Sequence, residues 1–413
     1  MDAKMSQQVT PNYPPNPPNS SKWQVMVFMG AATIAGEESL AEAAQADLNE
    51  MQLVGSDDKH LNIYVQIHRG EDDAPKAGYI EKGKPITIDA LADVPDTPER
   101  RKLHDGQALL GFVESVLKPP RFNPGDHTML VLWGHAYDFA FGRNKKRNGV
   151  IDAIDLTDIG RILKRVQERF GGAKLDILGC DACDLATVEM ACELAPFAKY
   201  LLASQIGVPI PGWPYDRILD RLRDPKGKEM LPAEFGSYAV RRFCEAYSPE
   251  SRPVSLTFLD LQRANELLMN GAYLAKVLEE KIADPGMRGR IADLFWQSQT
   301  GGGKPYVDLA DLCLTLVRSN SDDADIVEAA TNLGDFLIKA NPVVAGSRSA
   351  NRPFVIEHGR NTCETARLNG ISIYAPHVAP DLQFDPVFDM YKQFDFAKQT
   401  QWKDVVRALA TLS

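Results

Sequence analysis

Short apolar runs alternate along the first half of the chain with longer stretches whose apolar positions recur at helical spacing. The runs expected to form strands cover residues 23–29, 61–68, 128–134, 175–179 and 200–204. Between them, helices are expected at residues 37–54, 98–118, 157–170 and 185–195. Strands that alternate with helices of this length predict an α/β fold, with a mostly parallel sheet and helices on both faces.

Helical spacing dominates the second half of the chain. Two expected helices, at 214–222 and 231–247, lead to Pro249 and Pro253, which mark a domain boundary. Beyond them, helices are expected at residues 259–282, 285–298, 307–318, 324–339 and 396–411, with strands at 354–357 and 371–374. The predicted organisation is a disordered, proline-rich tail over residues 1–22, a first domain over 23–248 and a helix-rich domain over 249–413.

The segment from Lys174 to Tyr215 predicts a strand, a tight turn, a helix and a second strand, which together form a βαβ unit. Cys183 falls in the turn, at the carboxyl end of the first strand, and open α/β sheets bind their ligands at this edge. The turn is also expected to lead into the N-terminus of the helix, whose partial positive charge favours a thiolate over a thiol. Cys183 could therefore be a nucleophile, although a cysteine in such a place is more often a small buried apolar residue.

A nucleophilic thiol needs a base, and two histidines flank the apolar run at 128–134. At about 3.3 Å per residue, His127 and His135 lie roughly 26 Å apart, at opposite ends of this strand. If the strand runs parallel to 175–179, His135 shares a sheet edge with Cys183 and His127 does not. A cysteine and a histidine on neighbouring strand ends form the pair that activates a thiol.

A second interpretation rests on the spacing of Cys180 and Cys183, because a strand, a C-x-x-C motif and a helix also form a thiol oxidoreductase site. This interpretation leaves the strand that ends at His135 unexplained. A zinc site is disfavoured, since the chain has no second C-x-x-C and no paired histidines at ligand spacing. Asp181, just before the expected helix, is either an N-cap or a carboxylate that pairs with a guanidinium.

Segments spread over most of the chain match one enzyme family. They are LVLWGH at 130–135, DILGCDACDLATVEMACEL at 176–194, ASQIGVPIPGWPY at 203–215, YVDLADLC at 306–313 and GISIYAP at 370–376, preceded by WQVMVFMGAA at 23–32 and DLNEMQLVG at 47–55. Together they resemble the clostripain family of cysteine endopeptidases, which are relatives of the caspases, gingipains and legumain. The resemblance covers nearly the whole chain after residue 22 and implies a caspase-like sheet.

The resemblance also implies roles for individual residues. Cys183 would be the nucleophile and His135 the general base of an endopeptidase that works through an acyl-enzyme. Asp181 would form the acidic wall of a pocket for a substrate Arg or Lys, with Ser204 and Trp213 also contacting the substrate. The expected partners are therefore protein or peptide substrates.

Two positions depart from the family pattern. The family has a glycine after the histidine, whose amide helps to hold the oxyanion of the tetrahedral intermediate. Here Ala136 stands in its place, with the amide of Cys183 as the second expected donor, and alanine lacks the backbone freedom of glycine. Asp184 follows the nucleophile where the family has an apolar residue. These departures leave open an inactive scaffold that binds peptides or partner proteins in the same groove.

Composition and charge narrow the function further. The formal net charge of −10 argues against nucleic acid or an anionic membrane as the main partner. No apolar run approaches the roughly 20 residues of a membrane span, and residues 1–22 contain no apolar segment typical of a signal peptide. We therefore expect a cytoplasmic protein whose six cysteines stay reduced. The activity of a cytoplasmic protease must be regulated, so a regulatory protein partner is possible.

The loop at 142–149 lies between the two expected catalytic residues, and four of its eight residues are basic. An enzyme selective for basic residues would cut itself here, at Lys145, Lys146 or Arg147, and relatives are commonly matured by such a cut. A solvated surface turn is the alternative. No cofactor is predicted. The carboxylates of residues 71–73 could bind calcium, which some relatives use, but their spacing matches no established calcium motif.

Overall fold

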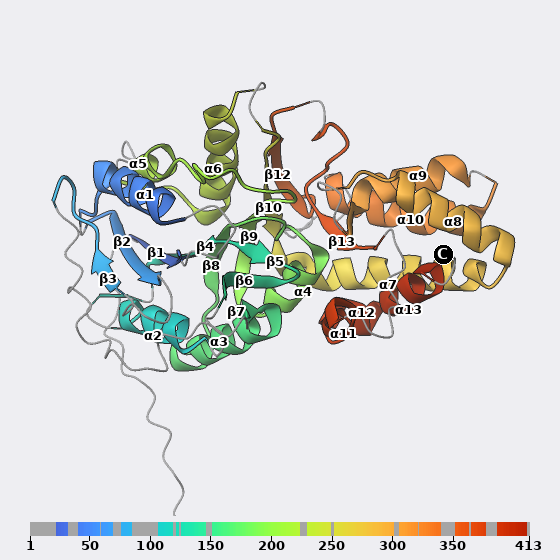
Figure 1. The fold of residues 1–413 in the computed structure, drawn as a ribbon, viewed down its shortest axis with the longest axis horizontal. Helices are drawn as coiled ribbons and strands as arrows, with labels where there is room; N and C mark the ends of the chain where they lie inside the picture. The colour runs from blue at the N-terminus through green and yellow to red at the C-terminus, as the bar shows by residue number, and fades with distance from the viewer. Residues whose placement is uncertain are drawn as a thin grey trace, which may run out of the picture.

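The computed structural model describes residues 22–31, 40–57, 59–68, 76–84, 106–118, 121–123, 125–145, 151–223, 229–248, 252–300, 305–320, 322–339, 352–362, 365–376 and 386–410. The expected tail before residue 22 and the acidic residues 71–73 lie outside these ranges. Within them the chain forms a central sheet between two layers of helices, with a further group of helices beside one end of the sheet (Figure 1).

The central sheet has eight strands in the order β12-β10-β9-β8-β4-β1-β2-β3. Its strands are β12 (Val355–Arg360), β10 (Ser255–Asp260), β9 (Ala198–Ala203), β8 (Leu175–Asp181), β4 (His127–Gly134), β1 (Trp23–Gly30), β2 (Leu61–His68) and β3 (Lys76–Tyr79). The run from β9 to β2 is parallel, while β3, β10 and β12 pair antiparallel at the two sides. The predicted mostly parallel α/β sheet is confirmed.

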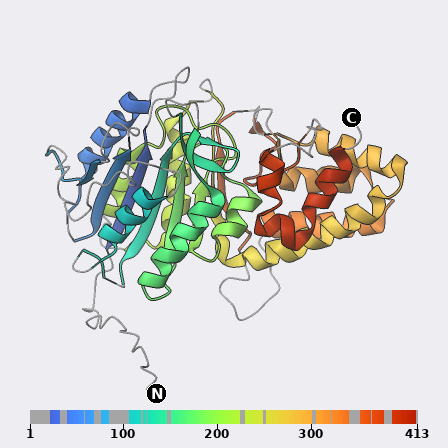
Figure 2. The same ribbon diagram turned by 60° about the horizontal axis from the view of Figure 1, so that its bottom comes forward.

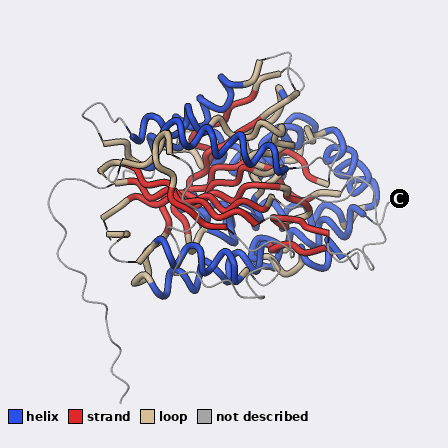
Figure 3. The backbone as a smooth tube through the Cα atoms, turned by 60° about the vertical axis from the view of Figure 1, so that its left-hand side comes forward, coloured by secondary structure: helices blue, strands red, loops and turns tan. Residues whose placement is uncertain are grey.

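Both faces of the sheet are buried, which explains why its strands read as apolar runs rather than as alternating patterns. β1 is buried at all eight of its positions. Val25 and Val27 belong to the apolar cluster on one face, and Met26 and Phe28 to the cluster on the other. The first face is covered by α1 (Leu40–Val54), α5 (Tyr215–Arg223) and α6 (Pro232–Ala246), and the second by α2 (Gln107–Val116), α3 (Leu156–Arg169) and α4 (Val188–Leu194) (Figure 3).

The last third of the chain is mainly helical and packs beside the sheet (Figure 2). Its helices are η2 (Leu261–Arg263), α7 (Ala264–Ile282), α8 (Pro285–Gln297), α9 (Leu309–Ser319), α10 (Ala324–Ile338), α11 (Pro386–Tyr391), α12 (Asp395–Thr400) and α13 (Trp402–Ala410). Aspartate side chains cap α8, α9 and α10, each accepting a hydrogen bond from an amide of the first turn. However, β10 and β12 come from this part of the chain and join the central sheet, which therefore extends past residue 248.

Two small sheets complete the fold. β5 (Ala136–Tyr137), β6 (Ala140–Lys145) and β7 (Ile151–Asp155) form a three-stranded sheet directly after β4. β11 (Tyr306–Asp308) and β13 (Ser372–Tyr374) form an antiparallel pair, called the ribbon below. An isolated bridge joins Ser372 of the ribbon to Thr187, which follows β8. The ribbon thus connects the helical part of the chain to the carboxyl edge of the central sheet.

Candidate active site

The ends of β4 and β8 place His135 and Cys183 at the same edge of the sheet. The two strands are parallel neighbours, and Trp133 lies opposite Asp181 in their register. His135 and Cys183 each follow two residues after this pair. Because neighbouring strands run about 4.8 Å apart, the two segments leave the sheet side by side.

His127 occupies the opposite end of β4. Its Nε2 lies 2.9 Å from Oε1 of Glu229, and its Nδ1 lies 3.7 Å from Oδ2 of Asp176. Its ring also packs against Trp23, with centroids 5.1 Å apart. The structure therefore brings His135, and not His127, to the edge that carries Cys183.

The backbone after His135 folds back at once as a tight hairpin. The carbonyl oxygen of His135 accepts a hydrogen bond from the amide of Gly142 at 2.8 Å. Tyr137 pairs with Ala140, so residues 138–139 form a two-residue turn. Both have left-handed backbones, with φ of 45° and 63°, as in the type I′ turns that usually contain Asn or Gly. Ala136, the expected oxyanion donor, is buried in the first strand of this hairpin.

The sulfur of Cys183 receives a hydrogen bond from the backbone. The amide of Val208 donates to Sγ at 3.3 Å, from the loop that follows β9. A Cβ on the neighbouring Gly207 would lie 3.9 Å from the same sulfur, so this loop lies against the thiol. An N–H donor stabilises a thiolate more than a thiol, because it bonds most strongly to the charged form.

The expectation that Cys183 lies at the N-terminus of a helix is wrong. Asp184 has a left-handed backbone with φ of 60°, which ends the strand in a turn, and its amide donates to the carbonyl of Ile206 at 3.3 Å. α4 begins only at Val188, where the side chain of Thr187 accepts a hydrogen bond from the amide of Met190 at 3.2 Å. Instead of facing a helix dipole, Sγ contacts the backbone of Val208: it accepts from the amide at 3.3 Å and, as a thiol, donates to the carbonyl oxygen at 4.0 Å.

Cys180 and Cys183 lie in different environments. Cys180 is fully buried within β8 and belongs to the apolar cluster beneath α3 and α4. Burial, with Asp181 next to it, raises the pKa of the Cys180 thiol well above its ordinary value. Cys183 is only partly buried, and neither residue is in a disulfide. The pair therefore lacks two accessible thiols of the kind that a dithiol redox site uses.

Asp181 is the last residue of β8 and does not cap a helix. Its carboxylate is buried and accepts hydrogen bonds from the amide of Trp213 and the hydroxyl of Tyr215, both at 3.1 Å. A second carboxyl group, that of Asp47 on α1, is buried nearby and accepts a hydrogen bond from the indole of Trp133. Burial raises the pKa of Asp181 to about 7 and, with the charge of Asp181, that of Asp47 to about 9.

Gly212 allows the loop after β9 to approach both carboxyl groups. Its φ is 64°, and a Cβ there would lie 3.1 Å from Oδ2 of Asp181 and 3.4 Å from Oδ2 of Asp47. The carbonyl of Gly212 accepts a hydrogen bond from the hydroxyl of Tyr247 at 2.6 Å. The two carboxyl groups therefore lie directly beneath the backbone of this loop.

An open cavity of about 580 Å³ lies against the same loop. Gly212, Tyr247 and Glu50 are among its lining residues. The carboxylate of Glu50 accepts a hydrogen bond from the amide of Tyr215 at 2.8 Å, and burial raises its pKa. Asp181 thus lies behind the wall of the cavity, while Glu50 forms part of the wall. Sequence reasoning missed both Asp47 and Glu50, although the segment 47–55 contains them.

Ser204 and Trp213 have structural contacts in this loop. The hydroxyl of Ser204 is buried, donates to the carbonyl of Ile206 at 2.8 Å and lies 3.2 Å from Oγ of Ser255. The indole of Trp213 is also buried and covers Gly179, where a Cβ would lie 2.9 Å from the ring. Both side chains shape the loop between β9 and α5, and their contact with substrate stays a prediction.

The remaining predicted features are described only in part. Lys145 ends β6, whereas Lys146 and Arg147 lie outside the described residues. Among the residues that the structure describes, no group of three or more His, Cys, Asp or Glu side chains could hold a metal ion. Within the same residues, no helix is long and apolar enough to cross a membrane.

Comparison with known proteins decides the family. The model of the clostripain family matches residues 32–408. The chain belongs to the clostripain family. Clostripain of Hathewaya histolytica is 23% identical over 434 aligned residues, which cover 91% of this chain and 78% of that protein. The family predicted from sequence is thus confirmed, and the chain is a cysteine protease that acts on peptides or proteins.

Solved structures of this family share the fold. A secreted C11 cysteine protease from Bacteroides thetaiotaomicron, bound to an irreversible peptide inhibitor, gives a TM-score of 0.61 at 16% identity and covers 93% of this chain and 100% of that one. An inactive zymogen C11 protease from Parabacteroides distasonis gives 0.59 at 15% identity, over 93% of this chain and 99% of that one. The predicted fold, with helices around the sheet and at the C-terminus, is confirmed.

The cytoplasmic location expected from the sequence is contradicted by this comparison, because similar proteases from Bacteroides thetaiotaomicron are described as secreted. The expectation rested on the lack of an apolar segment in residues 1–22, which does not establish where the enzyme acts.

Proposed function

We propose that this clostripain-family protease uses Cys183 as its nucleophile and His135 as its base. The observation that carries the proposal is the register of β4 and β8, which places both residues two positions beyond the same pair of strand residues. The hydrogen bond from the amide of Val208 to Sγ supports it, since this contact favours the reactive thiolate.

In this proposal, His135 takes the proton of the thiol as Sγ of Cys183 attacks the carbonyl carbon of the substrate. Backbone amides of Ala136 and Cys183 hold the oxyanion of the tetrahedral intermediate. The intermediate collapses when the peptide C–N bond breaks, and His135 returns the proton to the leaving amine. Water then attacks the thioester, with His135 as the base, and releases the acid product and the free thiol.

We further propose that the enzyme cleaves after Arg or Lys. Asp181 is buried two residues before Cys183, and Asp47 and Glu50 add two further carboxyl groups around Gly212. A guanidinium or ammonium group that enters beside this loop would meet acidic groups in a medium of low polarity, where charge pairing is strong. Arrival of the cation would lower the raised pKa of Asp181 and ionise it.

The catalytic pair is tested with a peptide acyloxymethyl ketone that ends in Arg, which labels an activated thiol. Labelling and peptidase activity should be lost in Cys183→Ala and in His135→Ala. The matched controls are Cys180→Ala and His127→Ala, which should keep most of both. Equal losses in Cys180→Ala and Cys183→Ala would favour a dithiol redox site. A folded wild type that is neither labelled nor active would favour the inactive scaffold, for which Ala136 and Asp184 are the arguments.

Specificity is tested with fluorogenic peptides that differ in the residue before the cut. Asp181→Asn should lower kcat/KM for Arg and Lys substrates by about two to four decades, which corresponds to the roughly 3–5 kcal/mol of a broken buried charge pair. Substrates with an uncharged residue at that position should change little. Faster cleavage by wild type after Asp or Asn would reject the acidic pocket. If Asp181→Asn lowers the stability of the protein but leaves its selectivity for Arg and Lys unchanged, the role of Asp181 is structural.

We also propose that the enzyme cuts its own loop at Lys145, Lys146 or Arg147. These basic residues match the proposed specificity, and they lie between His135 and Cys183 in the chain. Support comes from the Parabacteroides distasonis protease of similar fold, which is described as an inactive zymogen.

A further inference from the structure

Three loops leave the central sheet at the edge that carries the proposed catalytic pair, and all three contact the ribbon formed by β11 and β13. The loops follow β4, β8 and β9, and they carry His135, Cys183 and Val208 respectively. The ribbon comes from the last third of the chain, far from these loops in sequence. The reaction steps proposed above give the ribbon no role, although it contacts all three loops.

Gln205 joins the loop after β9 to the ribbon. Its side chain is buried, and its amide nitrogen donates to Oδ2 of Asp308 and to Oγ of Ser372, both at 3.0 Å. Its side-chain oxygen accepts a hydrogen bond from the amide of Gly370 at 2.7 Å. Three residues further on, the amide of Val208 donates to Sγ of Cys183. Gln205 therefore fixes the loop segment that contacts the thiol.

The loop after Cys183 is held by β13 of the ribbon. The amide of Ser372 donates to the carbonyl of Ala186 at 2.9 Å. The amide of Tyr374 donates to Oε1 of Glu189, on the first turn of α4, at 3.1 Å. Glu189 is fully buried, and burial raises its pKa to about 7. Two backbone amides of the ribbon thus hold the segment that follows Cys183 in the chain.

The hairpin after His135 reaches the ribbon through Phe139. Its buried ring meets Tyr306 edge-on, with centroids 5.4 Å apart, and lies 6.0 Å from Tyr374. Phe394, at the start of α12, adds a third ring at 4.9 Å. Phe139 holds a left-handed φ of 63°, which is unfavourable for a bulky residue. The aromatic contacts offset this backbone strain and pin the hairpin that begins at His135.

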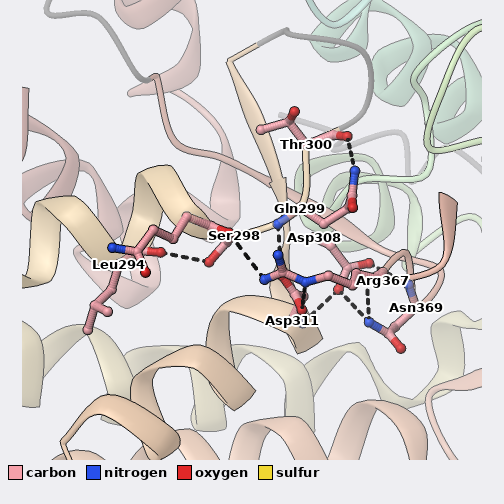
Figure 4. Close-up of polar contacts among 9 residues, drawn as sticks. Leu294, Ser298, Gln299, Thr300, Asp308, Asp311, Arg367 and Asn369 are labelled. Carbon is pink, nitrogen blue, oxygen red and sulfur yellow. Dashed lines mark hydrogen bonds and ion pairs between the residues drawn. The ribbon is translucent and has the colours of Figure 1, made fainter. Parts of the chain in front are cut away.

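The ribbon is itself firmly held. Asp308 is fully buried, and besides Gln205 it accepts hydrogen bonds from the amide of Asn369 at 2.6 Å, from its side chain at 3.1 Å and from the amide of Asp311 at 2.7 Å. Asp311 forms a two-pronged pair with Arg367 at 2.9 and 2.6 Å and accepts from the amide of Gln299 (Figure 4). Asp308 and Asp311 are buried and Arg367 is half-exposed, and buried carboxylates held by several hydrogen bonds each make a rigid support.

We propose that the ribbon is a platform that positions the catalytic pair, with Gln205 as a positioning residue for Cys183 and Phe139 as one for His135. The proposal rests on the assignment of that pair made above. Catalytic groups must be held within about 0.5 Å of their productive geometry, and a displacement of about 1 Å can lower the rate roughly a hundredfold. The helical part of the chain thereby takes part in catalysis without contacting the substrate.

The test compares the same substitution at two buried glutamines. Gln205→Met keeps the size of the side chain and removes its three hydrogen bonds. Gln24→Met is the matched control: Gln24 is also buried, donates to Asp126 and Arg121 and accepts from Asn62, but it lies at the opposite end of the sheet. Thermal melts should show that both variants fold and that both lose stability.

The readouts that separate the two are kcat, KM and the pH dependence of Cys183 alkylation by iodoacetamide. Gln205→Met should lower kcat about ten- to a hundredfold with little change of KM. It should also raise the midpoint of alkylation by about one pH unit, because the thiolate loses a well-placed N–H donor. Gln24→Met should keep the kcat and the midpoint of wild type.

A second pair of variants keeps the test decisive if Gln205→Met does not fold. Phe139→Leu should lower kcat, whereas Phe388→Leu should not, although Phe388 is buried and stacks on Tyr391 in the same aromatic group at 6.1 Å. Wild-type kcat and alkylation in Gln205→Met or Phe139→Leu would overturn the platform. Should Cys183→Ala remain active, it is the catalytic assignment that fails, whatever Gln205→Met does.

Discussion

Asp47 and Asp181 bring two carboxyl groups into one buried site, and their protonation links this site to the stability of the whole chain. Burial raises the pKa of Asp47 from 3.8 to about 9, so the folded protein holds a proton there that the unfolded chain has lost above pH 4. The folded state therefore binds more protons between about pH 4 and pH 9. Over that window, the free energy of unfolding falls as the pH rises.

Asp47→Asn removes this titration and should flatten the pH dependence. Relative to wild type, the variant should gain on the order of 4 kcal/mol in free energy of unfolding between pH 5 and pH 8, at about 1.4 kcal/mol per pH unit. Urea unfolding at the two pH values measures the difference. Asp335→Asn, at a half-exposed position on α10, is the control and should shift stability equally at both. An equal shift at both pH values in Asp47→Asn as well would contradict the buried, protonated Asp47.

Sequence reasoning could place His135 and Cys183 but not Asp47. A strand end is fixed by an apolar run, and parallel pairing brings the ends of neighbouring strands to one edge. Asp47 reaches Asp181 only because α1 packs on the same face of the sheet and Gly212 leaves room for both carboxylates. Neither the packing of a helix nor the approach of a distant loop has a local signature in the sequence.

The turn between β8 and α4 shows how a local pattern can mislead about an element. Apolar spacing continues from Leu185 into α4, which favoured a helix that starts beside Cys183. The left-handed backbone of Asp184 interrupts it, and Thr187 provides the cap instead. A single φ angle thus decides whether the thiol faces a helix dipole or a backbone amide from another loop.

The β6–β7 hairpin carries the predicted self-cleavage site. Lys145 pairs with Ile151 across it, so the described strands hold both sides of residues 146–150. Exposed polar loops are preferred sites of proteolysis. Intact mass of purified wild type should show fragments of about 16 and 30 kDa, from 45.6 kDa over 413 residues, whereas Cys183→Ala should remain a single chain. Replacing Lys145, Lys146 and Arg147 together by Gln should also keep the chain whole. An active wild type that stays at 45.6 kDa would contradict self-cleavage in this loop.

For the whole molecule, alternation of strands and helices was sufficient to predict a mostly parallel α/β sheet. It was not sufficient to predict how far the sheet extends beyond β9. β10 is a short strand of six residues in a region of helical spacing, and the sequence predicted no strand there. It pairs with β9 and β12, which lie far from it in the chain. The division into two domains at residue 249 stays a prediction, and the shared sheet joins the two parts closely.

The pairing of β4 with β8 also determines what a cut between 145 and 147 would produce. β4 would belong to one fragment and β8 to the other, and the two strands lie side by side in the buried centre of the sheet. The mature enzyme would then be a heterodimer of its own two pieces, each supplying one member of the catalytic pair. Its unfolding would become a dissociation, so its melting temperature would rise with protein concentration, whereas that of the uncut chain would not.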